Sequence, residues 1–495
     1  MKDFNLTNYE PKNILKHFAE ICKIPHISLH EKQLSDYLYN FFKQHGCEVI
    51  QDRVFNLIIK KPASKGYEDR PSILFQGHMD MVGSVAPGKN IDMLTTSVIP
   101  YIENGWIHAQ DTSLGMDNGG GIAIMMELFS NNSIKHGPLE GIITVAEEES
   151  TYGVDEIKKG AYKSKYNINL DTDGKNEIII ASAGGKSFVA IKKCKLESIS
   201  NQKVYSIKIS HLDGGHSGSN IYKQHINAIK FIGEALLLLA QDYEIRIIEI
   251  NGGSSQGAIP TQCEVIVAIN CSNKTKISDF LNNFFESYKV NLDQDHSATI
   301  EVKTSKTKYK NAFSLKDSTD IIDLISLTIN GEIIRDRQVE NVMYLSNNLG
   351  IISTSNNEVK IKNMTRSFND QLANLIVIKN KTICKKFGFT KFIEEPGDSW
   401  DSWVGDLKTN SIAKHYIKLF KKLHNIDLHV SKTPGGLEVV DIIKKNPIAS
   451  ANSISIGINN LDFHSYNERT ELISIQQLFE TLVELLRTFK GDENE

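Results

Sequence analysis

Cysteine is scarce and dispersed in this sequence. The 495 residues include six cysteines, which lie far apart and form no CxxC pair. Disulfide frameworks and thiolate zinc sites both depend on grouped cysteines, so neither is predicted. We expect six buried, reduced thiols, and we expect any bound metal ion to be held by histidine and carboxylate side chains.

Long apolar segments and a strong excess of charge are also lacking. The charged N-terminal stretch MKDFNLTNYEPKNILKHF contains no apolar core of a signal peptide, and no later segment is long and apolar enough to cross a bilayer. The formal net charge is −4 and the lysines and arginines form no basic stripe, which argues against binding to nucleic acid. These absences predict a cytoplasmic protein with neither a nucleic acid nor a membrane as its partner.

What is present is an ordinary globular composition, 40% hydrophobic and 23% charged, in a chain longer than one core usually supports. The first part alternates strand-like apolar runs, such as SILFQ, GIITVA and YNINL, with the helical pattern GGGIAIMMELF. Strands that alternate with helices predict an α/β domain with a mainly parallel sheet.

The pattern changes near residue 187. Strands such as KVYSIKIS and CEVIVAI alternate apolar and polar residues, and the helix HINAIKFIGEALLLLAQ lies between them. This combination predicts an antiparallel sheet with helices on one face. The turn-rich segment EEPGDSWDSW is expected to return the chain to the first domain. We therefore predict a discontinuous first domain, residues 1–186 and 395–495, and an inserted α+β domain, residues 187–394.

Five polar clusters follow predicted strands or begin a predicted helix. Loops at the carboxyl ends of strands in an α/β sheet converge on one crevice, so these clusters are candidates for a single site. Taken singly, each has an ordinary explanation: a histidine satisfied in the core, an aspartate in a turn, or an acidic run in a solvated loop. The clusters occupy residues 77–80, 112–120, 147–149, 171–173 and 463–465.

Taken together, the clusters predict a metal site. His78 and Asp80 fall on the same side of a strand, so Asp80 can accept a hydrogen bond from one imidazole nitrogen while the other binds metal. Asp117, in a tight turn, has two oxygens that can bridge two cations. Of the adjacent Glu147 and Glu148, one carboxylate is expected to bind metal and the other to take a proton from water. One bridging carboxylate with a histidine and a carboxylate on either side completes the ligand set of a zinc pair.

The order of several specific motifs resembles the two-zinc peptidase clan and, more closely, the bacterial aminoacyl-histidine dipeptidases, also called cytosol non-specific dipeptidases. The resemblance runs almost from end to end of the chain, through the motifs DTSLGMDNGGGIA, TVAEEES, NLDTD, DGGHSG, NNLGIIST, MTRS, GGLE and FHSYNER. It implies hydrolysis of dipeptides, of the Xaa-His type or of broad specificity, by a hydroxide that bridges two Zn²⁺ ions. Mn²⁺ and Co²⁺ are alternative metals.

The resemblance also assigns roles to residues of the first domain. It implies two ligand sets that share one aspartate: His78, Asp117 and Asp171 for one zinc, and Asp117, Glu148 and His464 for the other. Glu147 falls at the position of the general base, which takes a proton from water and returns it to the leaving amine.

The inserted domain is implied to act as a lid and to form a homodimer. His216, in the GGHSG motif, falls where a histidine helps to polarise the scissile carbonyl. Arg366 falls where an arginine pairs with the substrate carboxylate, a task that suits a guanidinium group; an exposed strand salt bridge is the alternative. Asn227 is a further candidate for a substrate contact, and Glu438 is a candidate partner for the substrate amine.

The sequence departs from the family pattern at four positions. Ala146 stands where the family usually has an aspartate, and Ser150 stands where it has a glycine. Pro434 replaces the histidine of the HAGLE stretch, and Gly257 replaces an asparagine before the AIP segment. None of the four is a metal ligand, so we expect these changes to affect substrate specificity and not metal binding.

Two other functions remain open on the sequence. The same ligand set serves metal-dependent deacylases or amidases of N-acyl amino acids, which hydrolysis assays would distinguish from dipeptidases. A non-catalytic binding protein that kept the fold is the second alternative. The retention of both Glu147 and Glu148 beside all the apparent ligands argues against that alternative.

Overall fold

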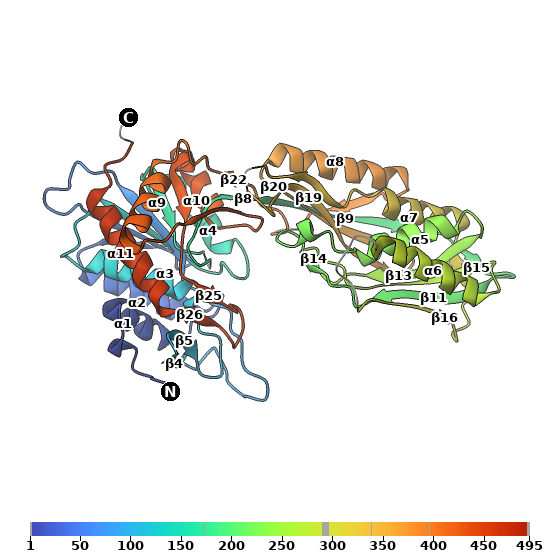
Figure 1. Ribbon diagram of the computed structural model, residues 1–495, viewed down its shortest axis with the longest axis horizontal. Coiled ribbons are helices and arrows are strands. Elements are labelled where there is room, and N and C mark those ends of the chain that lie inside the picture. Colours follow the sequence, from blue (N-terminus) through green and yellow to red (C-terminus); the bar gives the residue numbers. More distant parts are fainter. Residues whose placement is uncertain (1, 173, 290–296, 338, 396, 493–495) are drawn as a thin grey trace. The chain divides into compact units, whose positions relative to one another are not determined.

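The computed structural model describes residues 2–172, 174–289, 297–337, 339–395 and 397–492, which form two compact units (Figure 1). The first unit comprises Met1–Ser182, Trp403–Lys432 and Leu437–Glu495, and the second comprises Ala183–Ser402 and Thr433–Gly436. The chain thus leaves the first unit near residue 182 and returns near residue 403, close to the boundaries expected from the sequence. The short return of 433–436 to the second unit was not predicted.

The first unit is built on a mixed sheet with the strand order β1-β2-β6-β3-β7-β24-β8-β22, and β23 also pairs with β8. The neighbours β6, β3, β7 and β24 are parallel, whereas the other described pairs along this order are antiparallel. The parallel arrangement predicted for this domain is therefore confined to the centre of the sheet. The strands are β1 (Glu48–Gln51), β2 (Leu57–Lys61), β3 (Ile73–His78), β6 (Leu139–Thr144), β7 (Tyr166–Asn169), β8 (Glu177–Ser182), β22 (Trp403–Val404), β23 (His429–Thr433) and β24 (Ser453–Ser455).

Helices from both ends of the chain cover this sheet. In α1 (Lys12–Cys22) the buried residues Ile14, Leu15, Phe18 and Ile21 follow helical spacing, so one face joins the core. α3 (Met116–Ser130) is buried around its whole circumference, as expected for a helix inside the core. The other helices are α2 (Lys32–Gln44), α4 (Tyr152–Glu156), α9 (Ser411–His424), α10 (Val439–Lys445) and α11 (Leu472–Thr488).

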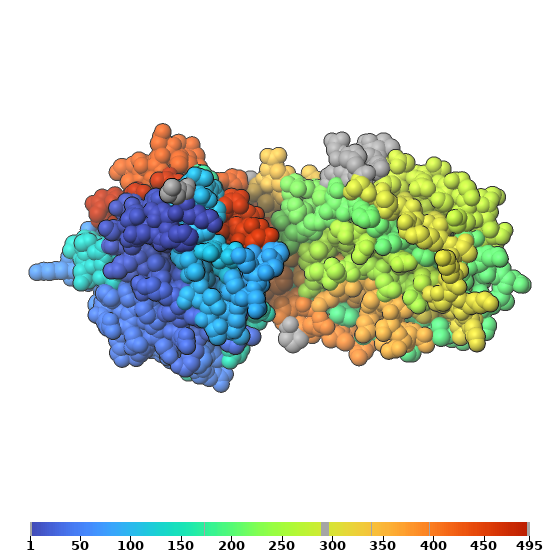
Figure 2. Space-filling model, turned by 90° about the horizontal axis from the view of Figure 1, so that it is seen from below, coloured from blue at the N-terminus to red at the C-terminus, as the bar shows by residue number. Residues whose placement is uncertain are grey.

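Segments far apart in sequence share the core of the first unit. α11 packs against both α9 and α3, and its buried leucines join the same apolar cluster as α1. In Figure 2 the N-terminal segments, in blue, and the C-terminal segments, in orange and red, form parts of one continuous surface. A smaller sheet joins β4 (Pro100–Glu103) and β5 (Trp106–Ala109) to β25 (Asn460–Leu461) and β26 (Arg469–Glu471).

The second unit is an antiparallel sheet of the order β16-β11-β15-β13-β19-β20-β9-β21, with β18 beside β19. Its helices share one apolar cluster with alternate residues of the strands, so they pack on one face, as predicted. The strands are β9 (Gly184–Lys193), β11 (Lys203–Ser210), β13 (Ile245–Gly252), β15 (Cys263–Ile269), β16 (Thr299–Thr304), β18 (Gly331–Arg335), β19 (Met343–Ser355), β20 (Glu358–Ser367) and β21 (Lys391–Ile393), and the helices are α5 (Ala228–Leu239), α6 (Lys274–Lys289), α7 (Leu315–Leu327) and α8 (Asp370–Lys386).

The cysteines and the helices bear on two expectations drawn from the composition. All six cysteines are buried and free of disulfide bonds, which confirms that prediction. Among the described residues, no helix combines the length and the apolar character needed to span a membrane.

Candidate metal centre

Neighbouring parallel strands bring three of the predicted clusters to one edge of the sheet. β3 lies between β6 and β7 and runs parallel to both. His78 is the last residue of β3, Glu147 and Glu148 follow β6, and Asp171 follows β7. Because the carboxyl ends of parallel strands face the same way, these residues reach the same edge of the sheet. Asp173, which ends the fourth cluster, lies outside the described residues.

Asp117 reaches the same edge from the start of α3. Its backbone is extended (φ −84°, ψ 107°), so α3 is kinked in its first turn. The side-chain Nδ2 of Asn118 donates to the carbonyl of Leu170 at 2.6 Å and to Asp171 Oδ1 at 3.0 Å. These two hydrogen bonds connect the Asp117 turn to the end of β7. A side chain at Gly77 would collide with Asn118, since an added Cβ would lie 2.3 Å from Asn118 Oδ1. The glycine before His78 therefore allows α3 to approach β3.

The two oxygens of Asp117 face different histidines. Oδ1 lies 3.1 Å from His78 Nε2, and Oδ2 lies 3.3 Å from His464 Nε2. His78 Nε2 also lies 3.3 Å from Asp171 Oδ1, and His464 Nε2 lies 2.8 Å from Glu148 Oε1. The five side chains thus form two groups that share one carboxylate. We call His78, Asp117 and Asp171 the His78 half-site, and Asp117, Glu148 and His464 the His464 half-site.

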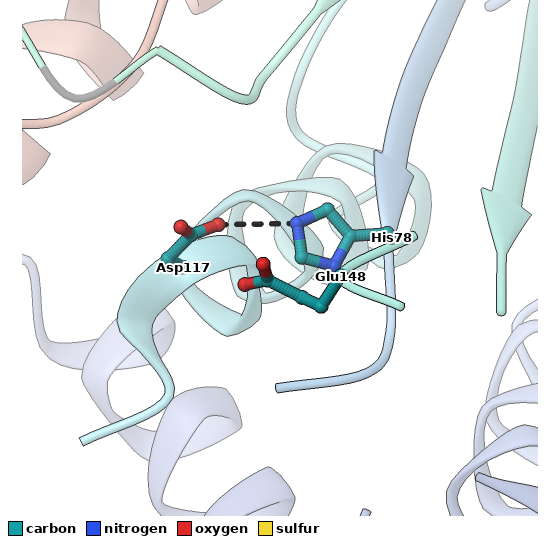
Figure 3. A group of neighbouring side chains, drawn as sticks. All are labelled: His78, Asp117 and Glu148. Carbon is teal, nitrogen blue, oxygen red and sulfur yellow. Dashed lines mark hydrogen bonds and ion pairs between the residues drawn. The ribbon is translucent and has the colours of Figure 1, made fainter. Parts of the chain in front are cut away.

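The donor atoms suit a metal ion. One donor atom from each of His78, Asp117 and Glu148 lies within 4.8 Å of the other two, and Figure 3 shows these side chains pointing toward one another. Glu148 Oε1 is buried and accepts no hydrogen bond of normal geometry, although His464 Nε2 is near. A buried carboxylate oxygen left in this way favours a cation. Imidazole nitrogens and carboxylate oxygens are donors that zinc, manganese and cobalt accept.

Asp80 links the histidine of one cluster to the glutamates of another. Its Oδ1 lies 3.3 Å from His78 Nδ1, and its backbone oxygen lies 3.1 Å from the same nitrogen. The carboxylate also accepts from the backbone N–H groups of Glu147 at 3.0 Å and Glu148 at 3.2 Å, and from Ser28 Oγ at 2.8 Å. Asp80 therefore fixes the imidazole ring and the acidic loop together, as supporting groups around metal sites do.

A bend before the acidic pair turns both glutamates toward the site. Ala146 has a left-handed backbone (φ 55°), which is uncommon for a residue other than glycine, and its N–H donates to Glu31 Oε1 at 2.9 Å. Without such a bend, adjacent side chains of an extended segment point in opposite directions. Glu147 Oε2 lies 3.9 Å from His78 Nε2, and the Glu147 side chain is 25% exposed.

Burial and mutual repulsion shift the acids of this cluster. Burial raises the pKa of Glu147 well above its usual 4.5, and the charges of Asp171 and Glu438 add to this against the opposite effect of His78. Burial likewise raises the pKa of Glu148 and of Asp171. These three carboxyl groups thus resist ionisation unless positive charge compensates them. At Asp117 the contacts with His464 and His78 outweigh burial and lower the pKa.

The histidines are shifted the other way. Close contacts with the carboxylates of Asp117 and Glu148 raise the pKa of His464 to about 10. Burial acts to lower the pKa of His78, but the charge of Asp171 and the contact with Asp117 outweigh burial and raise it well above 6.5. Each ring therefore retains a proton where a metal ion would otherwise lie, which is the expected electrostatic response of a metal-ligand cluster.

Glu438 lies in the first unit as a buried acid. It is 7% exposed, and its Oε2 accepts hydrogen bonds from Thr144 Oγ1 at 2.6 Å and from the amide of Gln76. Burial raises its pKa to about 8. The predicted contact of Glu438 with a substrate amine would therefore use its other carboxylate oxygen, Oε1.

The other predicted substrate contacts belong to the second unit. His216 in β12 (Gly215–His216) and Arg366 in β20 lie together, with His216 Nε2 and Arg366 Nη2 3.2 Å apart. Arg366 Nη1 donates to the carbonyl of Pro434 at 2.9 Å, and its guanidinium lies 5.2 Å from the ring centre of Trp400. Pro434, which replaces a family histidine, thus contacts the predicted carboxylate-binding arginine.

Asn227 has partners of its own. It caps α5, where its side-chain oxygen accepts from the N–H groups of Ile229 at 3.0 Å and Lys230 at 3.2 Å. Its amide nitrogen donates to the carbonyl of Leu349 at 3.0 Å. These contacts give the residue a structural role in the second unit that the sequence analysis did not anticipate.

Sequence reasoning gave no role to two residues that hold the cluster. Asn118 joins the Asp117 turn to Asp171, and Glu468 contacts the backbone of the Asp117 segment. Both lie inside motifs that carry the family resemblance, DTSLGMDNGGGIA and FHSYNER. Their positions in those motifs were the available signal, but their partners could only be found in three dimensions.

Comparison with known proteins agrees with this architecture. Residues 74–488 match the model of Peptidase family M20/M25/M40. The cytosol non-specific dipeptidase of Escherichia coli (strain K12) is 29% identical over 487 residues, which cover 97% of this chain and 98% of that protein. A crystal structure of aminoacylhistidine dipeptidase from Vibrio alginolyticus superposes with a TM-score of 0.90 at 26% identity, covering 99% of both chains.

More distant structures share the fold alone. A tripeptidase from Staphylococcus aureus subsp. aureus mu50 matches with a TM-score of 0.54 at 15% identity over 96% of this chain and 97% of that one.

The family is metal dependent, in keeping with the cluster of candidate ligands. The resemblance and the fold class inferred from sequence motifs are confirmed. The chain belongs to peptidase family M20/M25/M40 and is a hydrolase that acts on peptide bonds.

Proposed function

We propose that this protein is a cytoplasmic dipeptidase that binds two zinc ions through its His78 and His464 half-sites. The observation that supports this most directly is the division of Asp117, whose two oxygens each face a different histidine. A carboxylate used in this way suits a pair of cations better than a single one. The similarity to the dipeptidases of E. coli and V. alginolyticus supports a dipeptide substrate, and that to the cytosol non-specific dipeptidase of E. coli also supports a cytosolic location.

When bound, two zinc ions lower the pKa of a water molecule and polarise a carbonyl group. The protein's own residues supply the proton transfers. Glu147 takes a proton from the attacking water and returns it to the departing amine, since its carboxylate is next to His78 and partly open. Asp80 contacts both the Glu147 backbone and the His78 ring and so holds these two residues in place.

Side chains of the second unit recognise the substrate in this proposal. Arg366 binds the C-terminal carboxylate, which is supported by its burial among uncharged partners: the Ser217 hydroxyl, the Pro434 carbonyl and the Trp400 ring. His216 donates a hydrogen bond to the scissile carbonyl. His216 is an exposed residue, but desolvation of its ring and the charge of Arg366 lower its pKa to about 4, so the ring is neutral at physiological pH. Asn227 and Glu438 remain weaker predicted contacts, the latter for the free amine.

Hydrolysis assays on the metal-reconstituted chain test the activity. We expect release of amino acids from dipeptides such as alanyl-histidine, no cleavage of long peptides, and no cleavage of N-acetyl amino acids. Efficient hydrolysis of N-acetyl amino acids with inert dipeptides would replace the proposal by a deacylase. Binding of dipeptides without turnover would indicate a non-catalytic protein.

The role of Glu147 is tested by Glu147→Ala, with Glu149→Ala as the matched control. Glu149 is the exposed neighbour in the same acidic run. We expect Glu147→Ala to keep its metal content while kcat falls by about 10³-fold, the size of a lost general base. Glu149→Ala should behave like the wild type. Near-normal turnover by Glu147→Ala would show that another group takes the proton.

A homodimer formed through the second unit remains a prediction. Light scattering coupled to gel filtration gives the mass in solution, to be compared with 55.5 kDa for one chain. A mass of one chain at micromolar concentration would contradict it.

A further inference from the structure

One buried glutamate outside the proposed ligand set contacts the turn that carries Asp117. Glu468 lies four residues after His464 in the loop between β25 and β26 and is 3% exposed. Its Oε2 accepts from the N–H groups of Leu114 at 2.7 Å and Gly115 at 2.9 Å. Its Oε1 accepts from the N–H groups of Met116 at 3.0 Å and Asp117 at 3.4 Å. Four successive backbone donors therefore converge on one carboxylate.

This contact replaces a feature that the helix lacks. The first N–H groups of an α-helix have no partner within the helix, and a nearby serine, threonine, asparagine or aspartate usually caps them. The residue before α3 is Gly115, which has a left-handed backbone (φ 70°) and no side chain to act as a cap. Glu468, more than 350 residues away in sequence, does so instead. Its negative charge also suits the positive end of the helix dipole.

The other side of Glu468 is held in the loop of His464. The Glu468 N–H donates to the carbonyl of Ser465 at 3.1 Å, and Ser465 Oγ donates to the carbonyl of Asp462 at 2.6 Å. Asn460 adds a further donor to the carboxylate, since its Nδ2 lies 3.2 Å from Oε1. A single side chain therefore joins the segment of Asp117 to the segment of His464.

We propose that Glu468 is a positioning residue that holds Asp117 and His464 at the spacing required by the His464 half-site. The two segments it joins supply two of the three members of that half-site. The His78 half-site shares Asp117 but has independent supports, because His78 ends β3, Asp171 follows the neighbouring strand β7, and Asp80 and Asn118 fix them. Loss of Glu468 should therefore weaken the His464 half-site more than the His78 half-site. The inference rests on the proposed two-metal function.

The test compares Glu468→Gln with the wild type and with Glu471→Gln. Glutamine keeps the size of the side chain but presents an NH₂ group to backbone donors, so one arm of the contact is lost. Glu471, three residues later, accepts from Lys175 Nζ at 2.7 Å and from Asn459 Nδ2 at 2.8 Å, and neither partner carries a proposed ligand. It is a matched control for loss of a glutamate charge in the adjoining segment of the chain.

Full-length chains stripped of metal are titrated with Co²⁺, followed by calorimetry and by the visible absorption of the ion. The wild type and Glu471→Gln should bind two Co²⁺ per chain. Glu468→Gln should keep one site of wild-type affinity and bind the second ion 10- to 100-fold more weakly, the range seen when groups that support metal ligands are removed. Asn460→Ala, which keeps the carboxylate, should weaken the same site by less.

Two results would overturn the inference. One is unchanged affinity and absorption at both sites in Glu468→Gln. The other is equal weakening of both sites together with a lower melting temperature of the metal-free chain, which would mark general destabilisation. A wild-type chain that binds fewer than two ions would instead refute the proposed two-metal function, so the two failures are distinguishable.

Discussion

The two units differ in the charge of the candidate site residues whose pKa values are shifted. In the first unit burial raises the pKa of Glu147 and Glu438. In the second unit desolvation lowers the pKa of His216 to about 4 and that of Arg366 to about 10. At these positions the charged form is unfavourable without a counter-ion.

This contrast indicates what each unit is built to bind. An acidic cluster with two histidines is relieved by cations, whereas a buried arginine among uncharged partners is relieved by an anion such as a carboxylate. If the contrast holds, changes in the first unit should alter metal binding, and changes in the second should alter substrate recognition with the metals in place.

The largest expected effect separates two histidines. His78→Ala should lose metal and lower kcat/KM by about 10³-fold or more, because metal ions supply several kcal/mol of transition-state stabilisation. His216→Ala should retain its metal and lose about 10²-fold in kcat, as expected for one hydrogen bond to the developing oxyanion. Metal content by elemental analysis and steady-state kinetics measure both. Loss of metal from His216→Ala would break the comparison.

Removal of metal should destabilise the first unit alone. Binding at 1,000 times the dissociation constant stabilises a folded state by about 4 kcal/mol, and chelation removes that term. Hydrogen exchange read by mass spectrometry should therefore speed up in β3, β6 and β7 after chelation and remain unchanged in β19 and β20. Equal acceleration in β19 and β20 would show that the units do not respond separately.

Arg366→Lys tests whether the second unit recognises the substrate carboxylate. An ammonium group keeps the charge but cannot form two parallel hydrogen bonds to a carboxylate, so KM should rise about 10-fold with kcat nearly unchanged. A dipeptide amide, which lacks the carboxylate, should be cleaved equally poorly by both forms. If the variant also loses metal, Arg366 acts on the first unit and not on the substrate.

The smallest expected effect concerns pH and Glu438. The folded pKa of about 8 exceeds the usual 4.5, so the folded state binds more protons between these values and stability falls as pH rises through them. Glu438→Gln has no such titration. In metal-free protein, its melting temperature should match the wild type near pH 4.5 and exceed it by about 3 °C at pH 8. A constant difference at all pH values would contradict the buried, neutral acid.

Local sequence patterns predicted much of the fold. The helical pattern of α5 and the alternation in β11 predicted elements that the structure contains, because one face of each is buried. The antiparallel edges of the first sheet were not predicted, since short apolar strands have the same sequence pattern in parallel and in antiparallel pairing. Nothing in the local sequence indicated that residues 433–436 belong to the second unit.

The candidate site shows the same limit. The residues at the strand ends were predicted because polar clusters after apolar strands are visible in the sequence. The left-handed backbone at Ala146, which turns Glu147 and Glu148 inward, was not. Nor was Glu468 found as the cap of α3, since a helix start without its own capping residue does not indicate which distant side chain replaces it.

By itself, the sequence determined the kinds of groups available: histidines and carboxylates at the ends of buried strands, and no paired thiols. The resemblance to a known family implied two ligand sets around Asp117, but tertiary structure alone decided the distances within them and which residues hold them there. The physical reason is that side-chain chemistry and local periodicity are properties of short segments. Distances such as that between His464 and Asp117 depend instead on packing between segments hundreds of residues apart.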